Sequence, residues 1–313
     1  MKKKPYRYPL YLGLRVLQSL VLWLPREAGF FIARGIASAA FLVLGKERGK
    51  ALRHLGLAYE KEKTPAGIRE IARRMFIHWG ETAVDVLRFP KLDLEEVSRL
   101  VEMGDGTEKI DRVLREGKGM ILLTGHFGNW ELMGAFLRLR GYEGAVVGRR
   151  IYYEKYNEAI LNLRGNFTLK TLYQDESPRE FLKILHQNQI LGILADQDID
   201  WAEGIYVPFF GRPAYTLTAP VKLALVSGAP IVPVFLVRVG GRYRLIVEDP
   251  IRVEMKGSKE ETIREYTERC SRVLEEKIRA YPEQWAWMHR RWKTTPQREG
   301  VGQPVSFAGQ QND

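Results

Sequence analysis

Apolar positions recur along the chain at two different spacings, and the spacing changes near residue 118. Before that point they recur every three or four residues, which predicts helices at 47–58, 66–88 and 105–115. Beyond it, short apolar runs bounded by glycine or proline predict strands, with further helices between them. This alternation predicts an α/β domain with a central, mostly buried mixed sheet flanked by helices.

The run 120–124 (Met-Ile-Leu-Leu-Thr) is typical of a buried strand, because it is almost wholly apolar and glycines lie on both sides. The other predicted strands are 145–147, 169–172, 190–195, 231–237 and 243–247, and the other predicted helices are 130–140, 153–164, 178–187, 215–227, 258–280 and 282–292. Residues 208–213 are expected to form an apolar loop, and 294–313 a disordered tail.

The first 46 residues hold two strongly apolar segments, 8–24 and 29–44. Arg15, Arg26 and Arg34 interrupt them, so no run reaches the roughly 20 apolar residues that a spanning helix needs. Apolar residues continue directly after the small residues 37–39, which argues against a cleaved signal peptide. Residues 1–46 are therefore predicted to be membrane-anchoring helices attached to an α/β domain at 47–293, with buried core helices as the alternative.

Positive charge is concentrated at the N-terminus, where residues 1–53 carry +9 of the net charge of +11. The near-neutral remainder argues against extended nucleic-acid binding, whereas a basic apolar terminus indicates contact with anionic phospholipids on the cytoplasmic side. The single Cys270 excludes an intramolecular disulfide and a Cys-based zinc site. A second, aromatic and basic cluster indicates a further membrane contact, with packing as the alternative: Trp285, Trp287, Trp292, Arg290, Arg291 and Lys293.

His126 is the strongest catalytic candidate because it directly follows the predicted strand 120–124, where α/β folds place their sites. Gly125 and Gly128 permit a sharp turn, which we expect to fold Glu131 back onto the imidazole ring. A histidine polarised by a carboxylate can deprotonate a hydroxyl, and the segment holds no Ser or Cys for a covalent intermediate. The other four histidines are expected on the surface or in packing: His54, His78, His186 and His289.

The segment Gly-His-Phe-Gly-Asn-Trp-Glu, at 125–131, resembles the His-x4-Asp/Glu motif of glycerolipid acyltransferases. Further blocks resemble the late acyltransferases of lipid A biosynthesis, and the resemblance extends over almost the whole chain: 148–150, 195–198 leading into 207–211, and 282–285 with 289–293. It implies transfer of a fatty acyl chain from acyl carrier protein to a hydroxyl of a lipid A precursor at the bacterial inner membrane. It also implies that His126 is the general base, that Glu131 orients it, and that no cofactor or metal is needed.

The remaining candidate site residues fall into three groups. Substrate-binding candidates are the phosphate-binding arginines Arg149, Arg150 and Arg164, the strand-end residues Asp196 and Gln197, and Phe209, Phe210 and Gly211 as a wall of an acyl-chain pocket. Gly128 and Asn129 are expected to support the loop or supply backbone N–H groups to an oxyanion, for which a nearby arginine is the alternative donor. Asp196 and Asp198 can also be read as magnesium ligands, whereas the resemblance makes them structural or substrate-positioning residues.

Several alternatives remain open. The acceptor can be another glycolipid or a lysophospholipid, since residues 199–204 hold two acids where the family often has glycine and basic residues. More remote alternatives are a metal-dependent membrane phosphoesterase using His126, Glu131, Asp196 and Asp198, and a non-enzymatic membrane or RNA-binding protein. No motif specifies the acyl chain length or the oligomeric state.

Overall fold

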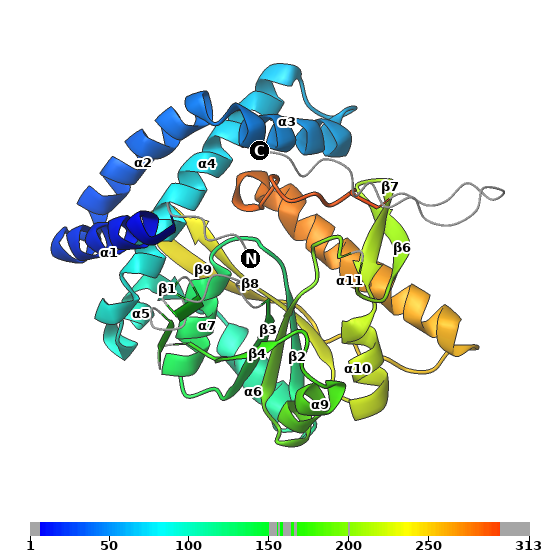
Figure 1. The fold of residues 1–313 in the computed structure, drawn as a ribbon. Helices are drawn as coiled ribbons and strands as arrows, with labels where there is room; N and C mark the ends of the chain where they lie inside the picture. Colours follow the sequence, from blue (N-terminus) through cyan, green and yellow to red (C-terminus); the bar gives the residue numbers. More distant parts are fainter. Residues whose placement is uncertain are drawn as a thin grey trace.

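A seven-stranded sheet forms the centre of the computed structural model, which describes residues 7–149, 155, 157–158, 164–165, 168–199 and 201–294 (Figure 1). In spatial order its strands are β1 (Val101–Glu102), β9 (Arg242–Val247), β8 (Ile231–Val239), β2 (Met120–Thr124), β5 (Ile190–Leu194), β3 (Gly144–Gly148) and β4 (Lys170–Tyr173). Neighbouring strands are parallel except β8 and β9, which are antiparallel. The predicted mixed sheet flanked by helices is confirmed.

Each face of the sheet packs into its own hydrophobic core. Successive side chains of a strand point to opposite faces of the sheet. In β8, Val234 and Leu236 therefore join one core, while Phe235 and Val237 join the other. The first core includes residues of α5 (Leu94–Leu100), α6 (Gly106–Leu114) and α7 (Trp130–Leu139). The second includes residues of α9 (Pro178–His186), α10 (Ala219–Ser227), α11 (Lys259–Ala280) and the N-terminal helices. Because both faces are covered, central strands such as β2 are buried throughout.

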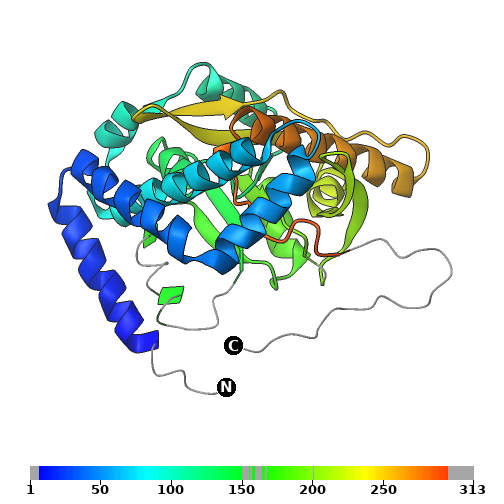
Figure 2. The same ribbon diagram turned by 90° about the horizontal axis from the view of Figure 1, so that it is seen from above.

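The N-terminal part of the chain consists of helices α1 (Arg7–Trp23), α2 (Arg26–Val43), α3 (Gly45–Tyr59) and α4 (Pro65–Leu87). Helix α2 packs along α4, where Phe41 and Phe76 meet with ring centroids 5.4 Å apart. The N-terminal part of helix α1 projects from the molecule (Figure 2), whereas its C-terminal part contacts α4, where Arg88 donates to the Val21 carbonyl oxygen at 3.0 Å. In the described part of the chain no helix is by itself long and apolar enough to cross a membrane; α2 and α3 reach that length only as a pair bent by 86°.

A buried ion network joins these helices to the sheet. The carboxylate of Asp85, on α4, accepts hydrogen bonds from Arg26 at the start of α2 (2.7 and 3.0 Å), from Arg238 on β8 (3.2 Å) and from the Tyr243 hydroxyl on β9 (2.5 Å). A buried charge is tolerated only when its oxygens are satisfied in this way. The network fixes α2 and α4 against the strands behind the loop that follows β2.

Two predicted elements between residues 208 and 227 are wrong. Residues 215–217 end strand β7 (Arg212–Leu217), which pairs with β6 (Gly204–Phe209), so the expected helix begins only at Ala219. The expected apolar loop 208–213 is the end of this hairpin, with Phe210 and Gly211 at φ 51° and 69° in its two-residue turn. Pro208 and Pro213 concealed the hairpin from the sequence pattern because proline is unusual within strands.

The predicted helix at 282–292 is also wrong beyond its first turn. Only Pro282–Gln284 is helical, as the 3-10 helix η3, and the chain then forms an isolated bridge between Trp285 and Phe127. The predicted helix at 153–164 lies largely outside the described residues, and so does the predicted tail from residue 295 onward.

Candidate active site

Three strand ends bring the candidate residues to one edge of the sheet. In the parallel ladder Thr124 lies opposite Leu194, so the loop that follows β2 and the segment that follows β5 leave the sheet together. Strand β3 is the next neighbour of β5 and ends at Gly148, just before Arg149. This is the edge at which open α/β sheets bind their ligands.

The loop after β2 has one tightly fixed shape. Gly128 has φ 62°, and a Cβ there would lie 2.1 Å from the Leu236 carbonyl oxygen, so only glycine fits. Asn129 caps the N-terminus of α7, since its Oδ1 accepts from the Leu132 N–H at 3.0 Å. Its Nδ2 donates to the Tyr243 hydroxyl at 2.9 Å. The loop is thereby held to β8 and β9.

His126 is paired with Asp196. Its ring Nδ1 lies 2.9 Å from Asp196 Oδ1, and its backbone N–H donates to Oδ2 at 2.7 Å. The Trp285 indole donates to the same Oδ2 at 2.8 Å. A Cβ on Gly125 would approach the Asp196 carboxyl carbon to 2.9 Å, so this glycine allows the carboxylate to lie directly under the loop.

The environment of Asp196 keeps it ionised. Burial raises the pKa of this carboxyl, but attraction to His126 and hydrogen bonds from His126 and Trp285 outweigh burial and hold the pKa well below its usual range. An ionised carboxylate can only accept at Oδ1, so the proton of neutral His126 resides on Nδ1 and the lone pair on Nε2. This is the tautomer that a general base needs.

The expectation that Glu131 folds back onto the His126 ring is wrong. Glu131 is instead held by Arg164, which donates from Nε at 2.9 Å and from Nη2 at 2.5 Å. The reason lies in α7, which begins at Trp130 and turns Glu131 toward Arg164, while the Trp130 ring packs against His126 with centroids 5.1 Å apart. Arg164 also donates to Thr171 on β4 at 3.2 Å, which ties the pair to the sheet.

A cavity of about 380 Å³ opens beside His126. Polar or charged side chains near the strand ends line one part of it, among them those of His126, Glu131, Arg149, Arg164 and Gln197. Most of the remaining wall is apolar and includes Leu122, Met133, Leu137, Val146, Ile193 and Leu223. An apolar cavity with a few convergent polar groups at one end suits an aliphatic ligand with a reactive polar terminus.

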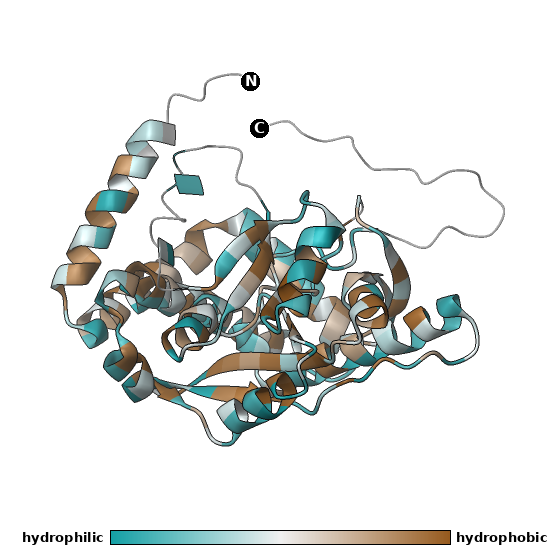
Figure 3. Ribbon diagram, turned by 90° about the horizontal axis from the view of Figure 1, so that it is seen from below, coloured by the Kyte–Doolittle hydropathy of each residue, from teal (hydrophilic) through white to brown (hydrophobic). Residues whose placement is uncertain are grey.

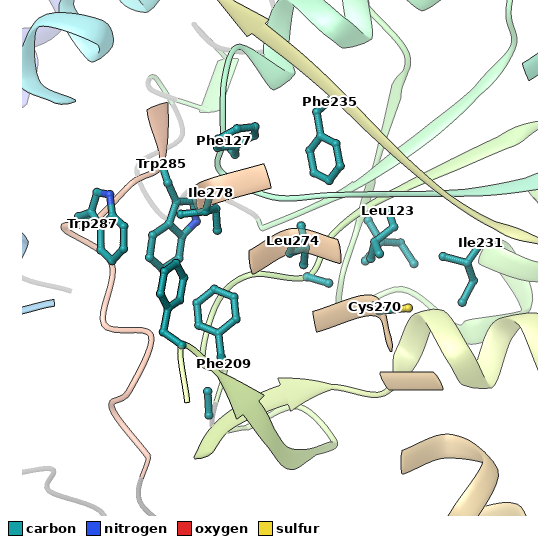
Figure 4. Packing of buried hydrophobic residues seen from close by; sticks show 14 of the residues in the cluster. Leu123, Phe127, Phe209, Ile231, Phe235, Cys270, Leu274, Ile278, Trp285 and Trp287 are labelled. Atoms are coloured by element: carbon teal, nitrogen blue, oxygen red, sulfur yellow. The ribbon is translucent and has the colours of Figure 1, made fainter. Parts of the chain in front are cut away.

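Phe209, Phe210 and Gly211 do not line this cavity, so their predicted role as its wall is wrong. Phe209 is 1% exposed and packs on Trp285, with ring centroids 5.6 Å apart (Figure 4). Phe210 packs on Tyr59 at 5.3 Å. The apolar wall comes instead from α7, α10 and the strands. Gly134 in α7 also lines the cavity, and a Cβ there would meet nothing closer than Thr168 Cβ at 3.8 Å.

The backbone N–H groups of Gly128 and Asn129 are already engaged. Gly128 N–H donates to the Gln284 carbonyl oxygen at 3.0 Å, and Asn129 N–H donates to the Leu236 carbonyl oxygen at 2.9 Å. The expectation that they stabilise an oxyanion is therefore wrong, whereas both residues do support the loop.

The segment 285–294 completes the site, and the sequence analysis missed its role. The Ala286 N–H donates to the His126 carbonyl oxygen at 3.1 Å, and His289 Nδ1 lies 2.9 Å from Gln197 Nε2. Trp285 and Trp287 are fully buried and Arg291 is 1% exposed, so these three residues cannot contact a membrane. His289, expected in packing or on the surface, lies instead with its ring centroid 4.8 Å from that of His126.

The remaining candidates are placed as follows. Arg149 lines the cavity, whereas Arg150 lies outside the described residues. Asp198 accepts two hydrogen bonds from Thr294, both at 2.6 Å, and so fastens the segment 285–294. Within the described ranges, no three or more His, Cys, Asp or Glu side chains are grouped as they would be to hold a metal ion.

His78 supports the loop from behind and makes the fold sensitive to acid. Its Nε2 lies 3.1 Å from the Gly128 carbonyl oxygen, and burial lowers its pKa from 6.5 to about 3. Between pH 6.5 and pH 3, His78 is protonated in the unfolded chain but neutral in the folded protein. The contribution of His78 to the free energy of unfolding is therefore highest above pH 6.5 and decreases as the pH falls below that value. We expect protonation of His78 in the unfolded chain to lower the free energy of unfolding by about 3 kcal/mol when the pH is reduced from 7 to 4.

Chemical denaturation at both pH values measures this loss. His78→Gln, whose amide can still donate to Gly128, serves as the comparison because it does not titrate. An equal loss in wild type and in His78→Gln would contradict the assignment.

Several known proteins are similar to this chain. The lipid A biosynthesis lauroyltransferase of Escherichia coli is 28% identical over 307 residues, which cover 95% of this chain and 94% of that protein. The lipid A biosynthesis myristoyltransferase of Escherichia coli is 23% identical, covering 93% and 90%. The phosphatidylinositol mannoside acyltransferase of Mycobacterium tuberculosis is 26% identical over 160 residues, so the match spans about half the length of that relative. A family model described as bacterial lipid A biosynthesis acyltransferase matches residues 2–294, and the chain belongs to this family.

Proposed function

We propose that the protein is a membrane-associated O-acyltransferase that moves a fatty acyl chain from acyl carrier protein to a hydroxyl of a lipid A precursor. The observation that carries the proposal is the His126–Asp196 pair at the polar end of an otherwise apolar cavity. Such a pair can deprotonate a hydroxyl, and the apolar cavity can hold an acyl chain beside it. A related glycolipid or a lysophospholipid is the alternative acceptor.

The reaction needs one proton acceptor and no covalent intermediate on the protein. His126 Nε2 takes the proton of the acceptor hydroxyl while the hydroxyl oxygen attacks the thioester carbonyl carbon. The resulting tetrahedral oxyanion collapses, the carbon–sulfur bond breaks, and the leaving thiolate takes the proton from His126 Nε2. The products are an ester and a free thiol, and the buried Asp196 stabilises the imidazolium that forms between the two steps.

The arginines beside the base suit a phosphorylated substrate. Arg164 is held in place by Glu131 and Thr171, and it lines the cavity together with Arg149. Guanidinium groups bind phosphate oxygens with two parallel N–H donors. We assign to them the phosphate of the acceptor lipid or of the carrier-bound donor, and we assign to Glu131 the role of fixing Arg164.

Membrane association is supported by the exposed face of α1 and α2. Large apolar side chains on these helices face solvent: Leu12, Leu14, Val16, Leu17, Leu20, Trp23, Phe31, Ile32, Ile36, Leu42 and Val43. Trp23 and Phe31 are 90% and 78% exposed, and apolar segments alternate with polar ones along α1 (Figure 3). With the basic residues of the same region, this surface suits the anionic cytoplasmic face of the bacterial inner membrane.

The double substitution Trp23→Ser with Phe31→Ser is expected to weaken binding to anionic phospholipid vesicles by about 10–100-fold, since each aromatic side chain contributes roughly 1.5 kcal/mol or more when buried. Cosedimentation with vesicles of phosphatidylethanolamine and phosphatidylglycerol measures the change. Val226→Ser with Met255→Ser removes two exposed apolar side chains elsewhere in the molecule and is the matched control. Equal vesicle binding by wild type and both double variants would rule out this surface.

The function itself is tested with the full chain in mild detergent. Acyl carrier proteins loaded with lauroyl, myristoyl or palmitoyl chains are the donors, and the acceptors are a tetra-acylated Kdo-bearing lipid A precursor, a phosphatidylinositol mannoside and a lysophospholipid. Mass spectrometry of the lipid product reads out transfer. We expect acylation of the lipid A precursor; transfer only to another acceptor identifies the alternative substrate, and no transfer to any of the three contradicts the proposal.

A further inference from the structure

The tetrahedral oxyanion of acyl transfer needs a hydrogen-bond donor close to His126. Such a donor must lie within about 2.7–3.1 Å of the developing charge. The loop N–H groups of Phe127, Gly128 and Asn129 are engaged, because they already donate to the carbonyl oxygens of Gly125, Gln284 and Leu236. A side chain that lines the polar end of the cavity can supply the donor instead.

The Gln197 side chain meets this requirement. Its Nε2 lies 3.3 Å from both ring nitrogens of His126, and the residue lines the cavity. An atom equally far from both nitrogens cannot lie along the lone pair of either, so Nε2 of His126 stays open to a hydroxyl. The amide thus lies beside the proton acceptor without blocking it.

His289 sets the direction in which this amide faces. Its Nδ1 lies 2.9 Å from Gln197 Nε2, where a neutral ring nitrogen accepts one amide hydrogen. The second hydrogen of the same NH₂ group can then be donated to a group bound in the cavity. With the amide flipped, its oxygen would instead need a proton on His289 Nδ1, so the tautomer of His289 sets the orientation of the amide.

His289 is also kept neutral by its surroundings. Burial and the neighbouring His126 lower the pKa of His289 to about 4, so a charged ring that donates from both nitrogens is disfavoured near neutral pH. The Nδ1 of His289 is therefore able to act as a hydrogen-bond acceptor under the conditions of the reaction.

We propose that the Gln197 amide donates the hydrogen bond that stabilises the tetrahedral oxyanion, and that His289 is a positioning residue which holds this amide with its N–H toward the cavity. The proposal rests on the acyl transfer proposed above and assigns one further group in it. As the hydroxyl oxygen bonds to the thioester carbon, the carbonyl π electrons move onto oxygen and the Gln197 N–H binds that charge. The hydrogen bond weakens again when the carbon–sulfur bond breaks and the carbonyl re-forms.

Kinetics of the full-length variants test both roles. Gln197→Met keeps the length of the side chain but removes the donor, and we expect kcat to fall by about 10²–10³-fold while KM stays within threefold, as for a transition-state donor. His289→Leu is expected to lower kcat by roughly tenfold or more, whereas His289→Asn, whose Oδ1 can accept at the place of Nδ1, should retain most of the activity. Gln187→Met, on the exposed end of α9, is the matched control and should leave kcat unchanged.

Three results would overturn the proposal. The first is a Gln197→Met kcat within threefold of wild type, and the second is an equal loss in His289→Leu and His289→Asn, which indicates a merely structural role. The third is a proton on His289 Nδ1, read from the ring nitrogen shifts of ¹⁵N-histidine-labelled protein, because that tautomer cannot accept from Gln197. The tautomer is measured without substrate, so it still decides the orientation if the wild type transfers no acyl chain and the proposed function itself fails.

Discussion

Replacing Asp196 by Asn is expected to lower kcat for acyl transfer by about 10³–10⁴-fold while leaving the shape of the site intact. Oδ2 accepts from the His126 backbone N–H and from the Trp285 indole, so the amide oxygen of Asn will occupy that position. The NH₂ group must then face His126 Nδ1, where Oδ1 now accepts. The proton of the imidazole is driven to Nε2, and the ring can no longer act as a base.

Asp198→Asn is the matched control, because Asp198 follows the same strand but bonds to Thr294 rather than to His126. Its kcat is expected to stay within tenfold of wild type. The comparison requires the rate of product formation by mass spectrometry and the thermal unfolding midpoint of each variant. An Asp196→Asn enzyme that keeps a third of the wild-type kcat would show that Asp196 does not set the tautomer.

His126→Ala is the second large effect, with an expected loss of about 10³–10⁴-fold in kcat, the range that a general base contributes together with its orientation. The fold should survive, since the loop is held independently by Asn129 and by the backbone bond from Gly128 to Gln284. Single-turnover rates with pre-mixed donor and acceptor measure the loss. His186→Ala, on the exposed end of α9, controls for the loss of a histidine elsewhere. Wild-type transfer by His126→Ala would contradict its assignment as the base.

The position of His126 could be predicted from local sequence alone. The run 120–124 coincides with β2, because a five-residue apolar segment between glycines has few alternatives to a buried central strand. The residues directly after such a strand lie at the edge of the sheet where ligands bind. The same local reasoning predicts Gln197 and Arg149 at this edge, because Gln197 follows β5 and Arg149 follows β3. Both residues line the cavity there.

The partner of His126 could not be predicted in the same way. Glu131 is five residues away in the chain, whereas Asp196 is separated by 70 residues and is brought close only by the pairing of β2 with β5. Which carboxylate meets the ring depends on the direction in which α7 leaves the loop, and sequence spacing does not report it. His289 was missed for the same reason, because the course of 285–294 is set by long-range contacts such as the bridge between Trp285 and Phe127.

The position of the cavity also depends on packing rather than on residue type. Phe209 and Phe210 are as apolar as any pocket wall, yet both are buried against aromatic side chains, including Trp285 and Tyr59. The cavity is lined instead by α7, α10 and the strands, and large side chains such as Trp130 and Phe181 also border it. Which apolar segment borders the binding space therefore depends on how the elements pack, and residue type alone does not report it.

The most direct test of the account is a double-mutant cycle of His126→Ala and Asp196→Asn, measured as the single-turnover rate of acyl transfer by the four proteins. If Asp196 acts through the His126 ring, its substitution costs nothing further once the ring is absent, so the double variant should be as slow as His126→Ala alone. If the two losses multiply instead, Asp196 acts independently of His126, and the two residues do not form the base that we propose.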